Sequence, residues 1–190
     1  MLPVLPETIP ALIIVDMQNF FFQKPGRSDG LEQVVENINH LTASFDIHGC
    51  PVVHVLSAYR PDGADWDLKM RAAGTPELIA GSLEAQIIDA IQVRPGHLQV
   101  VKTRYSAFFK TDLAEQLQGL RVGQVFVTGA YTHYCVNATV FDAYAHDFVP
   151  GLVSDAVLSH LPAEAEVMVA RMRRNGYHVL STAEVLAGLA

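Results

Sequence analysis

The chain has 190 residues, of which 50% are hydrophobic and 17% charged, a composition that excludes an intrinsically disordered protein. Thirteen lysines and arginines against twenty aspartates and glutamates give a formal net charge of −7, so we expect no nucleic-acid partner. No apolar run approaches the roughly 20 residues that cross a bilayer, and the start of the chain lacks the pattern of a secretory signal. We therefore expect no membrane association and one domain over residues 1–190 in the cytoplasm.

The chain begins by alternating strand and helix patterns. Residues 11–15 form an apolar run that is typical of a buried strand. Apolar side chains recur at three- and four-residue spacing over residues 31–41, which predicts a helix with Ser28 or Asp29 as its N-terminal cap. Residues 51–56 return to the strand pattern.

Residues 57–97 are the least regular part of the chain and carry repeated Gly and Pro turn signals. A stretch of that length without regular structure is usually functional, so we expect a substrate-covering loop with a short helical piece around residues 82–91. The alternation then resumes, with strands predicted at 98–102, 124–128, 148–154 and 178–181 and helices at 112–120, 136–145, 163–175 and near the C-terminus.

The repeated strand–helix–strand order predicts a three-layer α/β/α fold, a Rossmann-like parallel sheet with helices on both faces. In such folds ligands bind beyond the carboxyl ends of the strands. Asp16 directly follows the first strand, Lys102 ends the third, and Cys135 lies at the start of the helix after the fourth. An acid, an amine and a thiol are thereby predicted to meet at one edge of the sheet.

The chemistry of this trio is coherent. A helix N-terminus and a nearby ammonium both favour a thiolate, which makes Cys135 a candidate nucleophile. Asp16 is placed to take the thiol proton and later to activate water, and Lys102 is placed to stabilise both anions. Backbone N–H groups of residues 129–135 are placed to bind a developing oxyanion. Each residue alone also has an ordinary explanation, as a turn aspartate, a solvated lysine and a small core cysteine.

Three stretches of the sequence match a known family in order and spacing: Ile13–Phe21, Val101–Leu113, and Thr128–Val136 with Asp142 and Ala143 following. Through these motifs the chain resembles the isochorismatase-like cysteine hydrolases over nearly its whole length. The resemblance implies a six-stranded parallel sheet and a catalytic triad of Asp16, Lys102 and Cys135. It also implies a small-molecule substrate, no cofactor, and a homo-oligomer that is a dimer or a tetramer.

The resemblance further implies how an oxyanion is bound. A non-proline cis peptide at Ala130–Tyr131 would turn the Tyr131 N–H inward, and that N–H and the one of Cys135 would form the oxyanion hole. His133, two residues before Cys135, suggests a Cys–His dyad as an alternative. The implied loop geometry instead directs Asp16 and Lys102 at the thiol.

The branches of this family differ in chemistry. Nicotinamidases carry an Asp-x-His motif and a further His that hold a metal, and this spacing is absent after the second strand, so we expect no metal. Isochorismatases act on a vinyl ether, usually lack the nucleophilic cysteine, and carry a Gln where this chain has Tyr59 or Arg60. We therefore expect a hydrolase that cleaves a C–N bond of a small amide or a ureido or N-carbamoyl compound through a Cys135 thioester-type intermediate. The alternatives are vinyl-ether hydrolysis, for which Cys135 is dispensable, and a non-catalytic binding or assembly member.

Candidates for binding the substrate are aromatic or hydrogen-bonding residues close to the predicted site. Arg60 could pair with a substrate carboxylate, although a surface arginine in a turn explains it equally well. Aromatic rings wall many ligand pockets, but some of these rings are expected in the core. The candidates are Gln18, Phe21, Tyr59, Arg60, Phe108 and Tyr131.

Two other residues carry structural predictions. His54 lies inside the second predicted strand and is expected to be a hydrogen-bonded core residue. Cys50 opens that strand and therefore lies at the opposite edge of the sheet from Cys135. A strand of five or six residues separates these edges by about 17–20 Å, which excludes a disulfide between the two cysteines.

Overall fold

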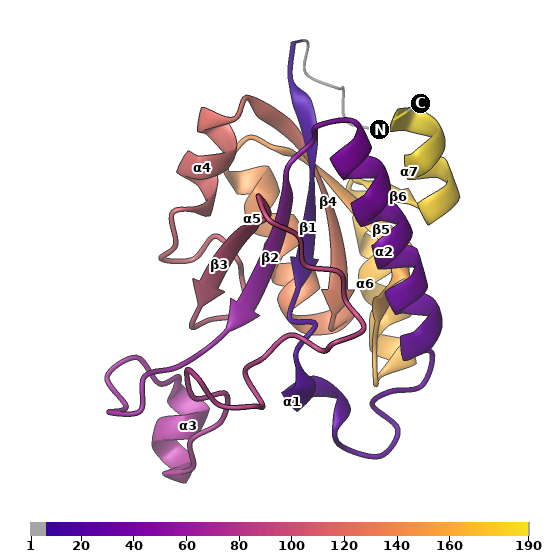
Figure 1. Ribbon diagram of the computed structural model, residues 1–190. Helices are drawn as coiled ribbons and strands as arrows, with labels where there is room; N and C mark the ends of the chain where they lie inside the picture. Colours follow the sequence, from indigo (N-terminus) through magenta and orange to yellow (C-terminus); the bar gives the residue numbers. More distant parts are fainter. Residues whose placement is uncertain (1–6, 190) are drawn as a thin grey trace.

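The computed structural model describes residues 7–189, and its centre is a six-stranded sheet in which all neighbouring strands are parallel. The strand order is β3-β2-β1-β4-β5-β6, so the order reverses between β1 and β4. Figure 1 shows the carboxyl ends of β1 and β2 at the bottom of the view, on the side of α1 and α3. The strands are β1 (Ile9–Val15), β2 (Val52–Ser57), β3 (Leu98–Lys102), β4 (Val122–Ala130), β5 (Val149–Leu158) and β6 (His178–Leu180).

Helices cover both faces of the sheet, which confirms the predicted three-layer α/β/α class. α2 and α7 pack on one face, and α4, α5 and α6 pack on the other (Figure 1). The helices are α1 (Asn19–Phe22), α2 (Leu31–Ile47), α3 (Leu68–Ala73), α4 (Leu113–Gly119), α5 (Asn137–Ala145), α6 (Pro162–Arg174) and α7 (Thr182–Leu189), with a π-helical turn η1 (Thr132–Val136) before α5.

The central strand β1 shows why its sequence is continuously apolar. Ala11, Ile13 and Val15 belong to the core on the α5 side, whereas Leu12 and Ile14 belong to the core on the α2 side. A parallel strand covered on both faces needs apolar side chains at every position, not at alternate ones. β1 therefore has no solvent-facing residue along Ala11–Val15 and ends where the sequence turns polar, at Asp16.

The long segment between β2 and β3 differs from the prediction. The helical piece expected around residues 82–91 is absent, and those residues form turns. The helix of this segment is α3 instead, which begins where Asp67 accepts a hydrogen bond from the Met70 N–H at 2.8 Å and ends at Gly74 with a φ of 62°. The Asp67 cap and the Gly74 stop are recognisable in the sequence, but six helical residues are too few to give a clear periodic pattern.

Backbone hydrogen bonds fasten this segment over the carboxyl edge of the sheet. The Phe20 N–H donates to the Glu84 carbonyl at 3.1 Å, and the Ile88 N–H donates to the Met17 carbonyl at 3.0 Å. The Tyr59 N–H donates to the carbonyl of Leu78 at 3.0 Å. The segment is therefore a fixed cover, because its main chain is paired with the residues that follow β1 and β2.

Two local predictions are resolved by the structure. Neither Ser28 nor Asp29 caps α2, because Gly30 occupies the cap position with a φ of 79°. His54 is 1% exposed and its Nε2 lies 2.9 Å from Nδ1 of His97, so it is a hydrogen-bonded core residue.

Among residues 7–189, no helix combines the length and the apolar character of a membrane span. The expected domain limits, residues 1 and 190, lie outside the described part of the chain.

Candidate active site

Asp16 leaves the sheet at the carboxyl end of β1. Its side chain is fully buried, and its backbone has a positive φ of 52°, a conformation that Asp tolerates better than most residues. The Asp16 N–H donates to the Val55 carbonyl oxygen at 2.9 Å, which holds the residue at the junction of β1 and β2. Non-glycine residues in this backbone region cluster at functional sites.

Lys102, the last residue of β3, extends past β2 to the other two members of the trio. Its Nζ lies 2.8 Å from Asp16 Oδ2 and 3.4 Å from Cys135 Sγ. The side chains of Lys102 and Asp16 are 1% and 0% exposed. Charges this deeply buried are tolerated only when they are paired and hydrogen bonded. The structure therefore brings together the amine, the acid and the thiol that were expected at this edge.

Cys135 lies in the turn η1 between β4 and α5. The chain enters this turn through Gly129, which has a φ of 102°, and through a cis peptide bond at Ala130–Tyr131. A β-carbon at position 129 would overlap with the carbonyl oxygen of Val15 on the neighbouring strand. A glycine is required here because β4 passes β1 too closely for any side chain. This close passage brings Cys135 next to the end of β1.

The electrostatics of the trio favour a protonated sulfur at rest. Burial raises the pKa of the Cys135 thiol, and the negative charge of Asp16 raises this pKa further, against a smaller lowering effect of Lys102. Burial opposes the charge of Lys102, but Asp16 and Cys135 outweigh it and raise the pKa of Lys102 to about 12. The helix N-terminus and the ammonium considered in the sequence analysis favour a thiolate, whereas burial and Asp16 shift the pKa of Cys135 in the opposite direction.

A serine that the sequence analysis did not single out also contacts the trio. The Ser57 hydroxyl, at the end of β2, accepts a hydrogen bond from Lys102 Nζ at 2.7 Å and donates one to Asp16 Oδ1 at 2.9 Å. Gln18, a predicted substrate-binding residue, does not line the cavity. Its buried amide pairs instead with the main chain of Ser57 and with the Ala85 carbonyl. Gln18 therefore holds the walls of the site together.

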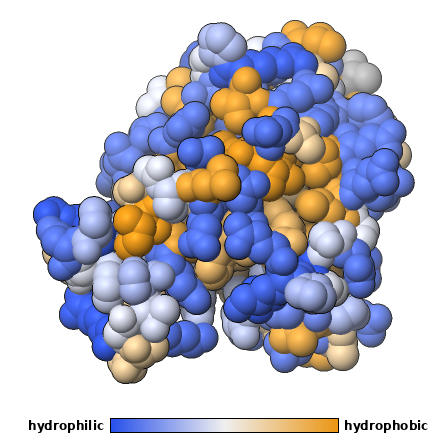
Figure 2. Space-filling model, turned by 60° about the horizontal axis from the view of Figure 1, so that its bottom comes forward, coloured by the Kyte–Doolittle hydropathy of each residue, from blue (hydrophilic) through white to orange (hydrophobic). Residues whose placement is uncertain are grey.

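A cavity of about 550 Å³ opens above Cys135 between α1, α3 and the turn after β3. Figure 2 turns this edge of the molecule toward the viewer and shows a notch beside the lobe at the lower left, which contains α3. Three of the six predicted substrate-binding residues line the cavity, namely Phe21, Tyr59 and Tyr131. The complete lining consists of Phe20, Phe21, Arg27, Ser57, Tyr59, Asp67, Leu68, Lys69, Met70, Glu77, Leu78, Lys102, Arg104, Tyr105, Tyr131, Tyr134, Cys135 and His160.

Two predicted substrate-binding residues lie elsewhere. The Arg60 side chain is 65% exposed and pairs with Asp62 at 2.5 Å, so it is the surface arginine of a turn. Phe108 is a core residue that stacks on the rings of His146 and Phe148, with centroid distances of 5.2 and 5.9 Å. The structure places both side chains outside the cavity, since a position near the motif in sequence does not decide the direction of a side chain.

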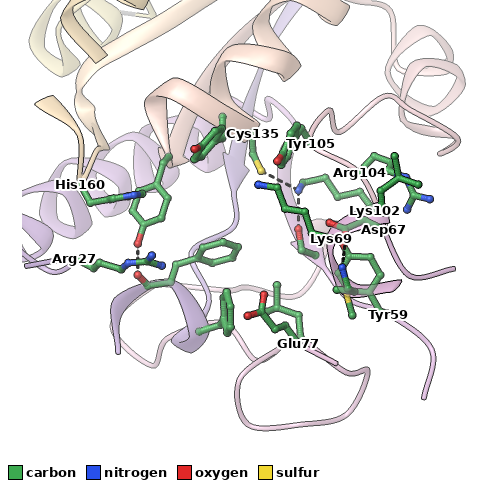
Figure 3. A pocket seen from close by; sticks show the side chains of 18 residues that line it. Arg27, Tyr59, Asp67, Lys69, Glu77, Lys102, Arg104, Tyr105, Cys135 and His160 are labelled. Atoms are coloured by element: carbon green, nitrogen blue, oxygen red, sulfur yellow. Dashed lines mark hydrogen bonds between the residues drawn. The ribbon is translucent and has the colours of Figure 1, made fainter. Parts of the chain in front are cut away.

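Charged residues at the cavity mouth were missed by the sequence analysis. Figure 3 shows Arg27, Lys69 and Arg104 around the opening, with the Lys69 side chain extending across the pocket. Asp67 lies near Lys102 and Tyr59 on the right of the view, and Glu77 lies below the pocket (Figure 3). Lys69 lies in α3, Asp67 and Glu77 lie on either side of that helix, and Arg104 and Arg27 lie after β3 and before α2. No periodic signal marks which of these side chains converge. Among these five residues, only Asp67 has a role that is recognisable in the sequence, as the N-terminal cap of α3.

The remaining sequence-based candidates have other partners. His133 Nδ1 lies 2.8 Å from the Ser159 hydroxyl, and the His133 ring does not line the cavity that contains Cys135. Cys50 and Cys135 are both free thiols. In the part of the chain that the structure describes, no group of three or more His, Cys, Asp or Glu residues has a geometry that could hold a metal ion.

Comparisons with known proteins agree with this geometry. The isochorismatase domain model matches residues 10–184. An isochorismatase family protein from Desulfovibrio vulgaris has a similar structure, with a TM-score of 0.84 and 32% identity over 94% of this chain and 98% of that one. The sequence is 30% identical over 161 residues to a probable inactive nicotinamidase of Arabidopsis thaliana, covering 80% of this chain and 82% of that protein. It is 32% identical over 160 residues to the N-carbamoylsarcosine amidase of an Arthrobacter species, covering 80% of this chain and 61% of that protein. The chain therefore belongs to the isochorismatase domain family, whose fold it shares.

Proposed function

We propose that this protein hydrolyses a C–N bond of a small amide or of a ureido or N-carbamoyl compound, through a thioester-type intermediate on Cys135. The observation that supports this proposal is the contact of Cys135 Sγ with Lys102 Nζ at 3.4 Å, and of Lys102 with Asp16 at 2.8 Å, at the floor of the cavity. An N-carbamoylsarcosine amidase among the relatives supports the same reaction class.

The first half of the reaction forms the acyl-enzyme. Asp16, which is hydrogen bonded to the Cys135 thiol, takes the thiol proton as the sulfur attacks the substrate carbonyl carbon. Lys102 stabilises the negative charge that develops on Cys135 Sγ as its proton leaves. The tetrahedral intermediate then breaks its C–N bond, and the leaving nitrogen takes the proton from Asp16. The products of this half are an acyl thioester on Cys135 and a free amine or ammonia.

Water completes the cycle. A water molecule attacks the thioester carbon and gives one proton to Asp16, and the second tetrahedral intermediate breaks its C–S bond. The departing sulfur takes that proton, so the thiol, the carboxylate and the ammonium return to their starting states. In both halves we assign the negative oxygen to the backbone N–H groups of Tyr131 and Cys135, which are the proposed oxyanion hole.

The charges at the cavity mouth favour a substrate that carries a carboxylate. Lys69 and Arg104 line the cavity, and neither forms an ion pair with an acidic side chain within residues 7–189. The Arg104 side chain donates to the backbone carbonyls of Asp65 at 3.0 Å and Thr103 at 2.5 Å. We propose that these two cations take the role that was first assigned to Arg60.

The experiment is a screen of small amides, ureido acids and isochorismate, with ammonia release and the mass of the Cys135 peptide as readouts. We expect a substrate-dependent adduct on Cys135 and a loss of turnover of at least about 1,000-fold in both Cys135→Ala and Asp16→Asn. Cys50→Ala is the matched control and keeps full activity.

Two results would replace this proposal. Vinyl-ether hydrolysis by Cys135→Ala at the wild-type rate, with loss of activity in Asp16→Asn, would establish isochorismatase-type chemistry. Ligand binding without turnover of any substrate class would establish a non-catalytic member, as the name of the Arabidopsis relative suggests for that protein.

We also propose that the protein is a homo-oligomer, either a dimer or a tetramer. Large apolar side chains are exposed around the cavity mouth and the neighbouring turn: Leu68 is 84% exposed, Tyr105 47% and Phe109 46%. Burial of such side chains between copies would lower the free energy of association. Sedimentation equilibrium measures the mass directly, and a monomer at micromolar concentration would refute this proposal.

A further inference from the structure

Ser57 occupies the central position among the strand ends that form the site. β2 lies between β1 and β3, and Ser57 is its last residue. In the sheet register Ser57 is the partner of Lys102 on β3, while Asp16 follows β1 on the other side. The Ser57 side chain is 5% exposed and lines the cavity floor. The serine hydroxyl is thus located between the two charged groups.

The hydrogen bonds of this hydroxyl have only one possible direction. Lys102 Nζ, 2.7 Å away, is an ammonium without an acceptor, so it must donate to Ser57 Oγ. The hydroxyl proton is then free to point at Asp16 Oδ1, 2.9 Å away. The hydroxyl therefore accepts from the cation and donates to the anion. Both hydrogen bonds have a charged partner, and such bonds stabilise a structure more than bonds between neutral groups do.

The main chain of Ser57 is held as firmly as its side chain. Gln18 is fully buried, and its Oε1 accepts from the Ser57 N–H at 2.8 Å. Gln18 Nε2 donates to the Ser57 carbonyl at 2.9 Å and to the Ala85 carbonyl at 2.7 Å. One glutamine amide thus pairs with both polar groups of Ser57 and ties them to the cover segment. Position 57 cannot shift without breaking this buried set of bonds.

We propose that Ser57 is a positioning residue, which holds the Lys102 ammonium against Cys135 Sγ and keeps the Asp16 carboxylate oriented. Its kinetic consequence rests on the hydrolase function proposed above. Its consequence for thiol reactivity does not, because alkylation of Cys135 requires no substrate. The two consequences can therefore be measured separately.

The test compares Ser57→Ala with Ser57→Thr in a Cys50→Ala background. We measure the second-order rate constant for alkylation of Cys135 by iodoacetamide between pH 6 and pH 10. Ser57→Ala removes one acceptor from Lys102 and one donor from Asp16, so we expect alkylation to slow by about 10-fold across this range. Ser57→Thr keeps the hydroxyl and is expected to remain within roughly threefold of the parent.

Once a substrate has been identified, Ser57→Ala should lower kcat by about 10- to 100-fold and leave KM within roughly threefold of the parent value. Ser106→Ala is the matched control, since Ser106 is also buried but its Oγ accepts only from the Phe108 N–H at 3.1 Å, away from the cavity lining.

Alkylation of Ser57→Ala at the parent rate or faster would overturn the proposal. A folded Ser57→Thr that is as slow as Ser57→Ala would overturn it as well, because the hydroxyl would then not be the active feature. If alkylation responds as expected but no C–N hydrolysis is found, the proposed function fails and the role of Ser57 stands. Hydrolysis with an unaltered kcat in Ser57→Ala refutes the role of Ser57 and leaves the function in place.

Discussion

The ion pair of Asp16 and Lys102 allows a quantitative prediction about stability. Both side chains are buried, and the pKa of Lys102 is raised from its ordinary value of 10.5 to about 12, with burial opposing the shift and Asp16 and Cys135 causing it. At about 1.36 kcal/mol per pKa unit, this shift corresponds to roughly 2 kcal/mol of stability. Because the folded-state pKa is the higher one, this contribution is complete below pH 10.5 and is lost as the pH rises through about 12.

Replacing one partner should cost more than this pairwise value. Lys102→Met keeps the apolar stem but leaves the Asp16 carboxylate buried without its cationic partner. Removal of one member of a buried pair costs about 3–5 kcal/mol, and we expect a loss of this size for Lys102→Met at pH 7. The double variant Asp16→Asn/Lys102→Met should be more stable than the sum of the single losses implies, by at least about 2 kcal/mol.

The assay is urea unfolding followed by far-UV circular dichroism for the four members of this cycle. The free energies of unfolding at pH 7 give the coupling energy directly. If the two single losses add to the loss in the double variant within about 0.5 kcal/mol, the pair does not interact as its geometry indicates, and the reasoning is refuted.

Three further predictions concern residues around this centre. Burial and the neighbouring His97 lower the pKa of His54 from 6.5 to about 4. About 3 kcal/mol of stability that is present above pH 6.5 should therefore be lost as the pH falls to 4. His54→Gln should flatten this pH dependence of the free energy of unfolding. An unchanged slope in that variant would contradict the assignment. Gly129→Ala should cost about 3 kcal/mol or more in a thermal melt, whereas Gly188→Ala, with open space around it, should stabilise α7 by roughly 0.5–1 kcal/mol. Lys69→Met should raise KM about 10-fold for a carboxylate-bearing substrate and leave a neutral amide unaffected, and equal effects on both would rule out charge recognition.

Much of the fold could be predicted because its elements have local causes. β1 is apolar at every position since both of its faces are covered, and that pattern is visible without coordinates. Gly74 and Asp67 mark the ends of α3, although the helix is too short for its periodicity to be recognised. The predicted helix near residues 82–91 was wrong because those residues pair with Met17 and Phe20 instead, and such a pairing has no signal in the sequence.

The sequence by itself determined the parallel sheet and placed Asp16, Lys102 and Cys135 at one of its edges, because strand ends in a parallel sheet meet wherever the strands are paired. Only the tertiary structure decided the direction in which the pKa of Cys135 is shifted and which side chains line the cavity. Burial raises the pKa of the Cys135 thiol, since it opposes a negative charge that local sequence features would favour. The lining of the cavity depends on how segments far apart in the chain fold over this edge of the sheet. This folding brings Ser57 and Lys69 to the site and turns Arg60 away from it.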